Sequence, residues 1–272
     1  MSLITISEYR GCGGREIAVK VAADLKLDLY DDARLQGEAM KTGLGDEELK
    51  GMEEKLPRLF DRLFRRNPEI YLDMMQALVY RAARKGQGVI VGHGSQVLLR
   101  EFGCAMHIRV FAPKKIRISR LQTEQNITLQ EAEKIVRNHD RDFNDFFKFA
   151  FSQDYNDPSL YDLVVNTAKI SSATVAAQIV ALAESEDMQT CSLSALQAIE
   201  RLALQKKVHS TLRDQGISLK TIFIDVPDSG LARLYGIATN AETRTRIVEI
   251  VRRIPEVSHV ETKILIKAQA EM

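Results

Sequence analysis

A glycine-rich turn follows the first apolar segment of the chain, Leu3–Ser7, and precedes residues 17–25, whose apolar side chains recur at helical spacing. In a strand–turn–helix unit of this kind, backbone N–H groups and the helix N-terminus together form a binding site for a phosphate. The sequence therefore predicts a phosphate-binding loop. Its residues are Gly11, Cys12, Gly13, Gly14, Arg15 and Glu16.

The end of this turn departs from the standard phosphate-binding loop, which closes with Gly-Lys-Ser/Thr. Arg15 and Glu16 stand in place of the lysine and the hydroxyl residue. Arginine keeps the positive charge and can bind phosphate through two donors, so we expect Arg15 to neutralise charge on a transferred group. Glu16 could reach Mg²⁺, or it could be a first-turn carboxylate favoured by the helix dipole. A tight turn that needs glycine only for steric reasons is an equal alternative.

Three further residues are candidates for binding an acceptor. Asp31 closes a short strand, where it could bind an acceptor nucleoside or accept its proton, whereas the adjacent Asp32 is interpreted as a helix cap. His93 lies between two glycines after a buried strand and faces the crevice where open α/β sheets bind ligands. A protonated His93 would hold an acceptor phosphate; a neutral, hydrogen-bonded histidine is equally compatible with this position. Asp162 begins a later strand, where it could orient an arginine.

A polar segment further along the chain carries two arginines at helical spacing. Arg137 and Arg141 are four residues apart and therefore share one face of a helix. This face predicts either a phosphate clamp with a catalytic role or an ordinary solvated surface. Phenylalanines crowd the same segment, and packing in a core or lid explains them better than stacking on a nucleobase. They are Phe143, Phe146, Phe147, Phe149 and Phe151.

Composition limits the classes of function. The length of 272 residues favours two domains. The net charge of +1 gives no electrostatic case for binding nucleic acid. No apolar stretch is long enough to span a membrane, and the start does not resemble a signal peptide, so we expect a cytoplasmic protein. Its three cysteines are far apart, and the histidines are scattered, so no disulfide framework or metal site is predicted. Cys12 is interpreted as a small residue in a serine-like position rather than an activated thiol.

Strands and helices alternate through the first two thirds of the chain. Apolar runs predict strands over 3–7, 27–32, 88–92, 105–112 and 161–167. Helical spacing predicts helices over 17–25, 46–66 with a break at Pro57, 69–85, 128–137 after a capping box, and 171–183. This alternation is typical of an α/β fold in which helices cover both faces of a parallel sheet.

A polar stretch then separates a smaller unit. We predict a first domain over residues 1–184, a linker over 185–192 and a second domain over 193–267. The second domain begins with a helix that ends before Gly216 and continues with strands over 221–226 and 231–238. A helix over 241–253 and a strand containing Val260 complete an α+β unit with its own core.

The first domain resembles the cytidylate kinase-like family of P-loop kinases. The matching residues are Ile4–Ser7 with Gly11–Ala18, Leu29–Asp31, Val89–Gly94 and Asp157–Thr167. The resemblance covers residues 3–182 and implies a nucleoside monophosphate kinase fold with a nucleotide-binding loop and a mobile lid. It also implies ATP and Mg²⁺ as cofactors and phosphoryl transfer to CMP or dCMP.

Three departures from the family pattern leave a second interpretation open, and the first is that the loop lacks the Lys-Ser/Thr pair of monophosphate kinases. His93 stands where related sequences carry an arginine, and Phe143 and Asp145 stand where lid arginines are common. An arginine that stabilises a phosphoryl-transfer transition state is worth about 10³–10⁵ in rate. The protein could therefore be a non-catalytic nucleotide sensor, or an assembly module with a vestigial pocket. Arginine in place of Phe143 is expected to raise activity if that position surrounds the transition state.

The second domain resembles a BON domain. The matching residues are Leu231–Ala238, Arg244, Ile247, Val251 and Pro255–Val260. The resemblance implies binding of a small ligand, a lipid or a protein partner. Because we find no export signal, we expect a sensing or assembly role, in which the protein forms a homo-oligomer or binds another partner.

Overall fold

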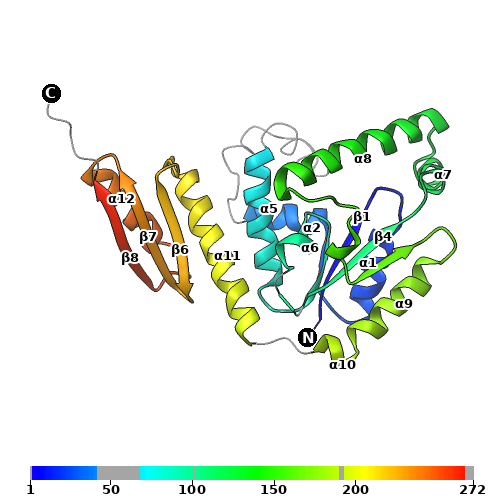
Figure 1. Ribbon diagram of the computed structural model, residues 1–272, viewed down its shortest axis with the longest axis horizontal. Helices are drawn as coiled ribbons and strands as arrows, with labels where there is room; N and C mark the ends of the chain where they lie inside the picture. The colour runs from blue at the N-terminus through cyan, green and yellow to red at the C-terminus, as the bar shows by residue number, and fades with distance from the viewer. Residues whose placement is uncertain (1, 42–67, 101, 104, 190–192, 267–272) are drawn as a thin grey trace. The chain divides into compact units, whose positions relative to one another are not determined.

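The structure is a computed structural model of the 272-residue chain, and it describes residues 2–41, 68–100, 102–103, 105–189 and 193–266. The chain divides into two compact units (Figure 1). The first unit contains residues 1–35 and 85–195, and the second contains residues 36–84 and 196–272. The grouping of 36–84 with the C-terminal residues is not apparent from the sequence pattern, and domain boundaries at 184 and 193 remain a prediction.

The first unit is built on a five-stranded parallel sheet, as the sequence predicts. Its strands are β1 (Leu3–Glu8), β2 (Leu29–Tyr30), β3 (Gly88–Val91), β4 (Ala105–Phe111) and β5 (Leu163–Asn166), in the order β2-β3-β1-β4-β5. The central strand β1 pairs with β3 on one side and with β4 on the other, so that Ile4 lies between Val89 and Met106. Five of the six residues of β1 are buried, which is typical of a parallel strand covered on both faces, and they include the polar Thr5 and Ser7 beside Leu3, Ile4 and Ile6.

Helices flank this sheet and position the ends of its strands. They are α1 (Gly14–Asp24), α2 (Asp32–Lys41), α6 (Ser95–Leu98), α7 (Lys114–Gln125), α8 (Leu129–Phe151), a 3-10 turn (Pro158–Leu160), α9 (Ser172–Ala183) and α10 (Glu186–Gln189). Helix α1 packs beside α9, and α7 packs beside α8 (Figure 1). No helix within the described residues combines the length and apolar character that a membrane span needs.

Two helices differ from the sequence expectation. The predicted capping box at Thr128 and Glu131 is confirmed, but α8 continues to Phe151 rather than ending near Arg137. Helix α2 begins at Asp32, and its capping carboxylate belongs to Asp31, whose Oδ1 accepts the N–H of Arg34 at 3.1 Å. Asp32 is therefore a first-turn residue and not the cap. The helical pattern expected over 46–66 lies outside the described residues.

The second unit contains α5 (Pro68–Ala83) and a small α+β structure. Its other elements are α11 (Leu193–Asp214), β6 (Ile222–Asp228), β7 (Leu231–Ala238), α12 (Ala241–Arg252) and β8 (His259–Ile266). The two predicted strands are found as β6 and β7, which pair antiparallel, and β8 joins β7 in parallel after the α12 crossover. Val208 of α11 and Ile247 of α12 are buried in one hydrophobic cluster with Leu234 of β7.

Candidate functional site

The turn between β1 and α1 is the centre of the candidate site. Gly11 and Gly13 have φ angles of 85° and 87°, in the left-handed region that favours glycine. A Cβ on Gly11 would also lie 2.9 Å from the carbonyl oxygen of Arg117. Cys12 between them is fully buried, and its N–H donates to the Tyr9 carbonyl at 3.1 Å. Backbone conformation thus requires glycine at both positions, and close packing requires it at Gly11 as well.

The N–H groups that open α1 already hold an anion supplied by the chain. Glu8, the last residue of β1, accepts the N–H of Gly14 through Oε2 at 2.7 Å and the N–H of Arg15 through Oε1 at 2.8 Å. These are two of the N–H donors that a helix leaves without an intrahelical partner. The N–H donors of the turn thus bind an anion, but it is a carboxylate of the chain that the sequence analysis did not single out, and phosphate binding here stays a prediction.

Burial raises the pKa of the Glu8 carboxyl above its ordinary value. The two backbone hydrogen bonds and the positive charges of His139 and Arg117 oppose this shift without cancelling it. Burial likewise raises the pKa of the Cys12 thiol, which keeps it protonated. This favours the interpretation of Cys12 as a small packing residue over that of an activated thiol.

Arg15 and Asp31 are brought together by the fold. The Arg15 guanidinium is exposed and lies 3.1 Å from Oδ2 of Asp31. Glu16, one residue further along α1, accepts a hydrogen bond from the Ser172 hydroxyl at 2.9 Å and lies 3.7 Å from the Lys20 ammonium. A residue predicted to bind nucleotide and one predicted to bind the acceptor therefore meet at the same edge of the sheet.

His93 and Asp162 occupy different surroundings. His93 has a φ of 58° between two left-handed glycines, and its Nε2 lies 2.7 Å from Oδ1 of Asp32. Its position at the carboxyl end of β3 places it at the same edge as Asp31. Asp162 instead accepts the backbone N–H of His107 at 2.7 Å and donates its own N–H to the His107 carbonyl. Asp162 thereby fixes the start of β5 against β4.

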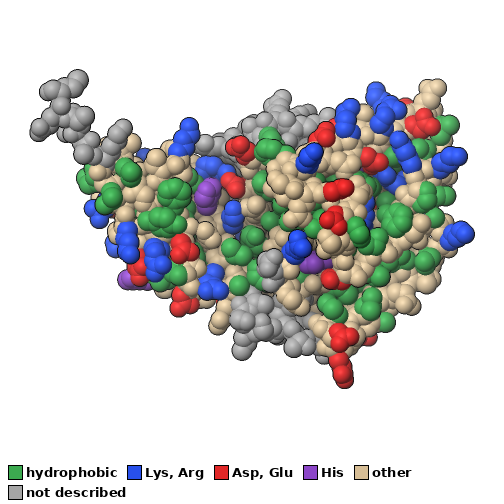
Figure 2. Space-filling model, in the orientation of Figure 1, with side chains coloured by type: hydrophobic (Ala, Val, Ile, Leu, Met, Phe, Trp, Pro, Cys, Tyr) green, Lys and Arg blue, Asp and Glu red, His purple; other side chains and the backbone are tan. Residues whose placement is uncertain are grey.

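Arg137 and Arg141 lie on the exposed surface of α8. Arg141 pairs with its neighbour Asp142 at 3.2 Å. Figure 2 shows Lys and Arg side chains gathered over α7 and α8. In the part of the chain that the structure describes, neither arginine contacts the glycine turn, so their predicted catalytic role remains a prediction.

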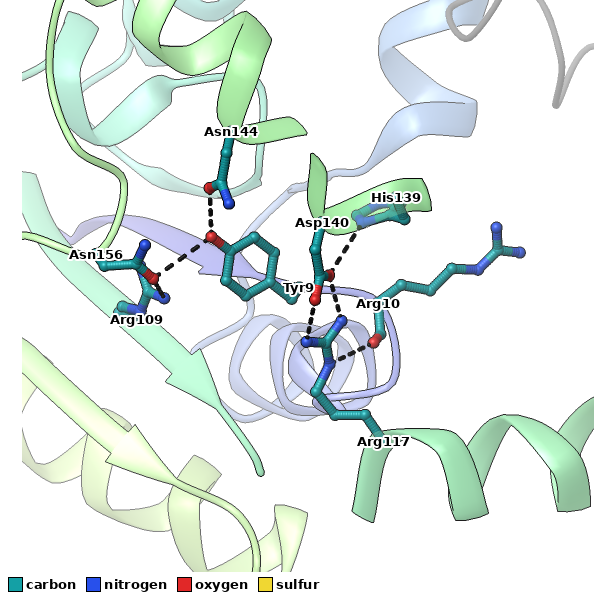
Figure 3. A network of polar contacts seen from close by, with 8 residues as sticks. All are labelled: Tyr9, Arg10, Arg109, Arg117, His139, Asp140, Asn144 and Asn156. Atoms are coloured by element: carbon teal, nitrogen blue, oxygen red, sulfur yellow. Dashed lines mark hydrogen bonds and ion pairs between the residues drawn. The ribbon is translucent and has the colours of Figure 1, made fainter. Parts of the chain in front are cut away.

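A different arginine ties α8 to the glycine turn. Arg117 binds both carboxylate oxygens of Asp140, at 2.9 and 2.6 Å, and donates through Nε to the Arg10 carbonyl at 2.9 Å (Figure 3). Burial alone would raise the pKa of Asp140, but hydrogen bonds from His139 and Arg117 outweigh it and hold the pKa below its ordinary value. The side chain of Arg10 points away from this network (Figure 3).

Arg120, which lies on α7 like Arg117, also contacts the glycine turn. It donates to the carbonyl oxygens of Gly11, Cys12 and Thr167, at 3.3, 3.0 and 2.6 Å. Sequence reasoning missed Arg117 and Arg120, although their spacing of three residues after Pro113 places them on one helical face. Both arginines hold the backbone of the turn rather than an open anion site.

Aromatic side chains fill the space between α8 and the edge of the sheet. Phe143 makes edge contacts with Tyr9 and Tyr155, whose ring centroids lie 5.9 and 4.7 Å away, and it stacks on Phe147. The buried guanidinium of Arg109 lies 4.4 Å from the centroid of Tyr155. These contacts favour packing for Phe143, the interpretation that the sequence analysis preferred, and the effect of an arginine at this position on activity stays a prediction.

Comparison with known proteins agrees with this architecture. A model of the cytidylate kinase-like family matches residues 3–169. The chain belongs to this family. It is 31% identical over 174 residues to a cytidylate kinase of Staphylothermus marinus, covering 63% of this chain and 90% of that protein. It is 27% identical over 175 residues to a cytidylate kinase of Pyrococcus horikoshii, covering 62% and 81%.

A solved structure supports the fold of this family member. An uncharacterized protein from Eubacterium ventriosum superposes with a TM-score of 0.52 at 16% identity, over 68% of this chain and 100% of that one. The family match ends before α9, so the C-terminal α+β structure lies outside it. The family match therefore covers the strands of the parallel sheet but not α9 or α10.

Proposed function

We propose that the protein transfers a phosphoryl group from ATP to a pyrimidine nucleoside monophosphate such as CMP or dCMP. The observation that carries the proposal is the turn between β1 and α1, where the N–H groups of Gly14 and Arg15 bind the two oxygens of one anion. A helix N-terminus with this property suits phosphate. The curated relatives of the chain are named cytidylate kinases, which gives the acceptor class.

Catalysis by such a site depends on positioning and charge stabilisation rather than on covalent chemistry. The backbone of Gly11–Gly14 would hold the phosphates, and Arg15 would turn from Asp31 toward the transferred group. Asp31 and His93 would bind the acceptor, supported by Asp162 at the start of β5. Arg137 and Arg141 would close from α8 onto the transferred phosphoryl group.

The residues present fit ATP together with Mg²⁺. The carboxylate of Glu8 is a stand-in for a phosphate at the N–H donors, which demonstrates that the turn can accept two anionic oxygens. Within the described residues no three metal-binding side chains gather into a site. Mg²⁺ commonly binds through substrate phosphates with few protein ligands, and Glu16 is the nearest candidate carboxylate in the loop. The ion would neutralise phosphate charge.

A non-catalytic nucleotide sensor is the second candidate. The occupied N–H groups of the turn favour it, as does the packing of Phe143 where an arginine would serve catalysis. In this version the first unit binds a nucleotide and the C-terminal structure relays its state.

Turnover and binding measured together distinguish the candidates. The purified chain is incubated with Mg·ATP and a panel of nucleoside monophosphates while ADP formation is followed, and nucleotide binding is measured by calorimetry. ADP that forms only with CMP, dCMP or a related acceptor supports the kinase. Saturable binding without turnover supports the sensor, and robust turnover rules the sensor out. Absence of both would leave an assembly module with a vestigial pocket.

For the C-terminal residues we propose a BON-like domain over 193–267, joined by the linker 185–192 to a nucleotide-binding domain over 1–184. A cavity of about 460 Å³ within the second unit offers a place for a small ligand. Its lining includes Arg81, Lys207, Ser229 and Glu256. We propose a cytoplasmic protein in which this domain senses a ligand, binds a protein partner or mediates homo-oligomerisation.

A further inference from the structure

The Glu8 carboxylate fits the glycine turn closely. A Cβ added to Gly14 would lie 2.8 Å from the carboxyl carbon of Glu8, so the absence of a side chain at Gly14 is what admits the carboxylate. Both oxygens are engaged, and they bind consecutive N–H groups at the start of α1. This two-point contact occupies the donors that a phosphate would need.

The nearby arginines form ion pairs with carboxylates other than Glu8. Arg15 pairs with Asp31, and Arg117 pairs with Asp140. Within the described part of the chain no salt bridge joins Glu8 to a cation. Burial nevertheless raises the pKa of its carboxyl, so the ionised side chain is less favourably placed here than in water. A displaced Glu8 side chain would regain hydration, which offsets part of the free energy lost with its two hydrogen bonds.

We propose that Glu8 is an internal competitor for the phosphate cradle: its carboxylate closes the turn, and a nucleotide binds only when that side chain rotates out. The inference rests on the proposed function, because it takes the turn to be the nucleotide site. Glu8 therefore sets the nucleotide affinity of the loop. Its departure makes the Gly14 and Arg15 N–H groups available at the moment of binding.

The test compares ADP binding by calorimetry in the full chain and in two variants. Glu8→Ala removes the competing anion, and we expect affinity for ADP to rise about tenfold or more. Glu8→Gln keeps the shape but only one acceptor oxygen, so its gain should be smaller. Glu124→Ala, which removes an exposed carboxylate from α7, controls for the change in net charge. Circular dichroism verifies folding, and Glu8→Gln carries the test if Glu8→Ala does not fold.

A second readout needs no nucleotide. The amide resonances of Gly14 and Arg15 should shift with the ionisation of Glu8 during a pH titration, and this shift should vanish in Glu8→Gln. Equal ADP affinity in the unchanged chain and in Glu8→Ala overturns the competitor while leaving the proposed function intact. Tighter binding in Glu8→Ala without turnover on any acceptor supports the competitor and counts against the kinase. Amides that do not titrate in the unchanged chain also overturn the inference.

Discussion

Single residues at the candidate site already have partners within the chain. Arg15 contacts Asp31, His93 contacts Asp32, and Glu8 contacts the N–H groups of the turn. A reaction at this edge of the sheet must exchange those internal partners for substrate groups. Substitutions that change charge at these positions should therefore alter activity more than stability wherever the side chain is exposed.

Arg15→Ala is expected to lower kcat by about 10³-fold, because the guanidinium would no longer neutralise the transferred group. The free energy of unfolding should change by less than about 1 kcal/mol, since 71% of the Arg15 side chain is exposed. Steady-state kinetics and urea denaturation measure the two effects. Arg15→Lys retains the charge and should be intermediate, whereas unchanged kcat in Arg15→Ala would remove the catalytic role.

Asp140→Asn is expected to lower the free energy of unfolding by about 3 kcal/mol at neutral pH. The reason is that the buried Arg117 guanidinium loses its carboxylate partner. The pKa of Asp140 is lowered in the folded chain, so its contribution is present above the ordinary value of 3.8 and is lost as pH falls through the folded pKa. Denaturation between pH 2 and 7 should therefore show a shallower loss of stability on acidification in the variant. Glu133→Gln, which changes an exposed carboxylate of α8, is the control. If stability falls equally steeply with pH in Asp140→Asn and in the unchanged chain, the ion pair does not contribute as proposed.

Individual contacts of the site were the least predictable part. The glycine turn and the arrival of Asp31 and His93 at one edge follow from strand order and from the spacing of the glycines. The contact between Glu8 and the turn depends on a side-chain rotamer and on how the chain doubles back over six residues. No periodicity in the sequence encodes that choice.

At the scale of secondary structure, strong patterns predicted the elements well. The apolar runs of β1, β3 and β4 and the capping box of α8 were all found where the sequence placed them. Helix α7 was missed because it is mostly polar, and its buried face includes Arg117 beside Ile118 and Leu121. Arg117 is buried because it forms an ion pair with Asp140 of α8, and the local hydrophobicity of the sequence cannot reveal such a long-range partner.

Phe143→Arg tests the aromatic packing of α8. We expect a loss of about 2–4 kcal/mol of stability and no gain in activity, because the half-buried ring contacts Tyr9, Tyr155 and Phe147. Thermal unfolding and ADP formation are the measurements. Phe143→Leu, which keeps an apolar side chain, should lose less stability, and higher turnover in a folded Phe143→Arg variant would return this position to the catalytic shell.

At the scale of the whole molecule, the second unit joins segments that are far apart in sequence. Asp73 of α5 accepts from Arg213 of α11 at 2.7 Å, and the His209 ring nitrogen and the Lys206 ammonium lie 3.8 and 3.9 Å from the same carboxylate. This cluster links residues 36–84 to the C-terminal part of the unit.

Asp73→Asn should lower the His209 pKa further. That pKa is already below its ordinary value because of burial and the charges of Lys206 and Arg213, and Asp73 is the group that opposes the shift. Titration of the His209 imidazole by NMR measures the change, with Asp225→Asn in the same unit as the control. A His209 pKa that stays constant or rises in Asp73→Asn would show that the carboxylate does not act on the ring.

The interleaved chain path also bears on biosynthesis. Residues 36–84 leave the ribosome well before residues 196–272, with which they form one compact unit. Closing that long loop is slow compared with forming local structure, so the nascent chain should hold the early segment incompletely packed until translation is nearly finished. Chaperone engagement and protease sensitivity are then expected to concentrate on α5 during synthesis and to disappear from this helix once the last strand has been added.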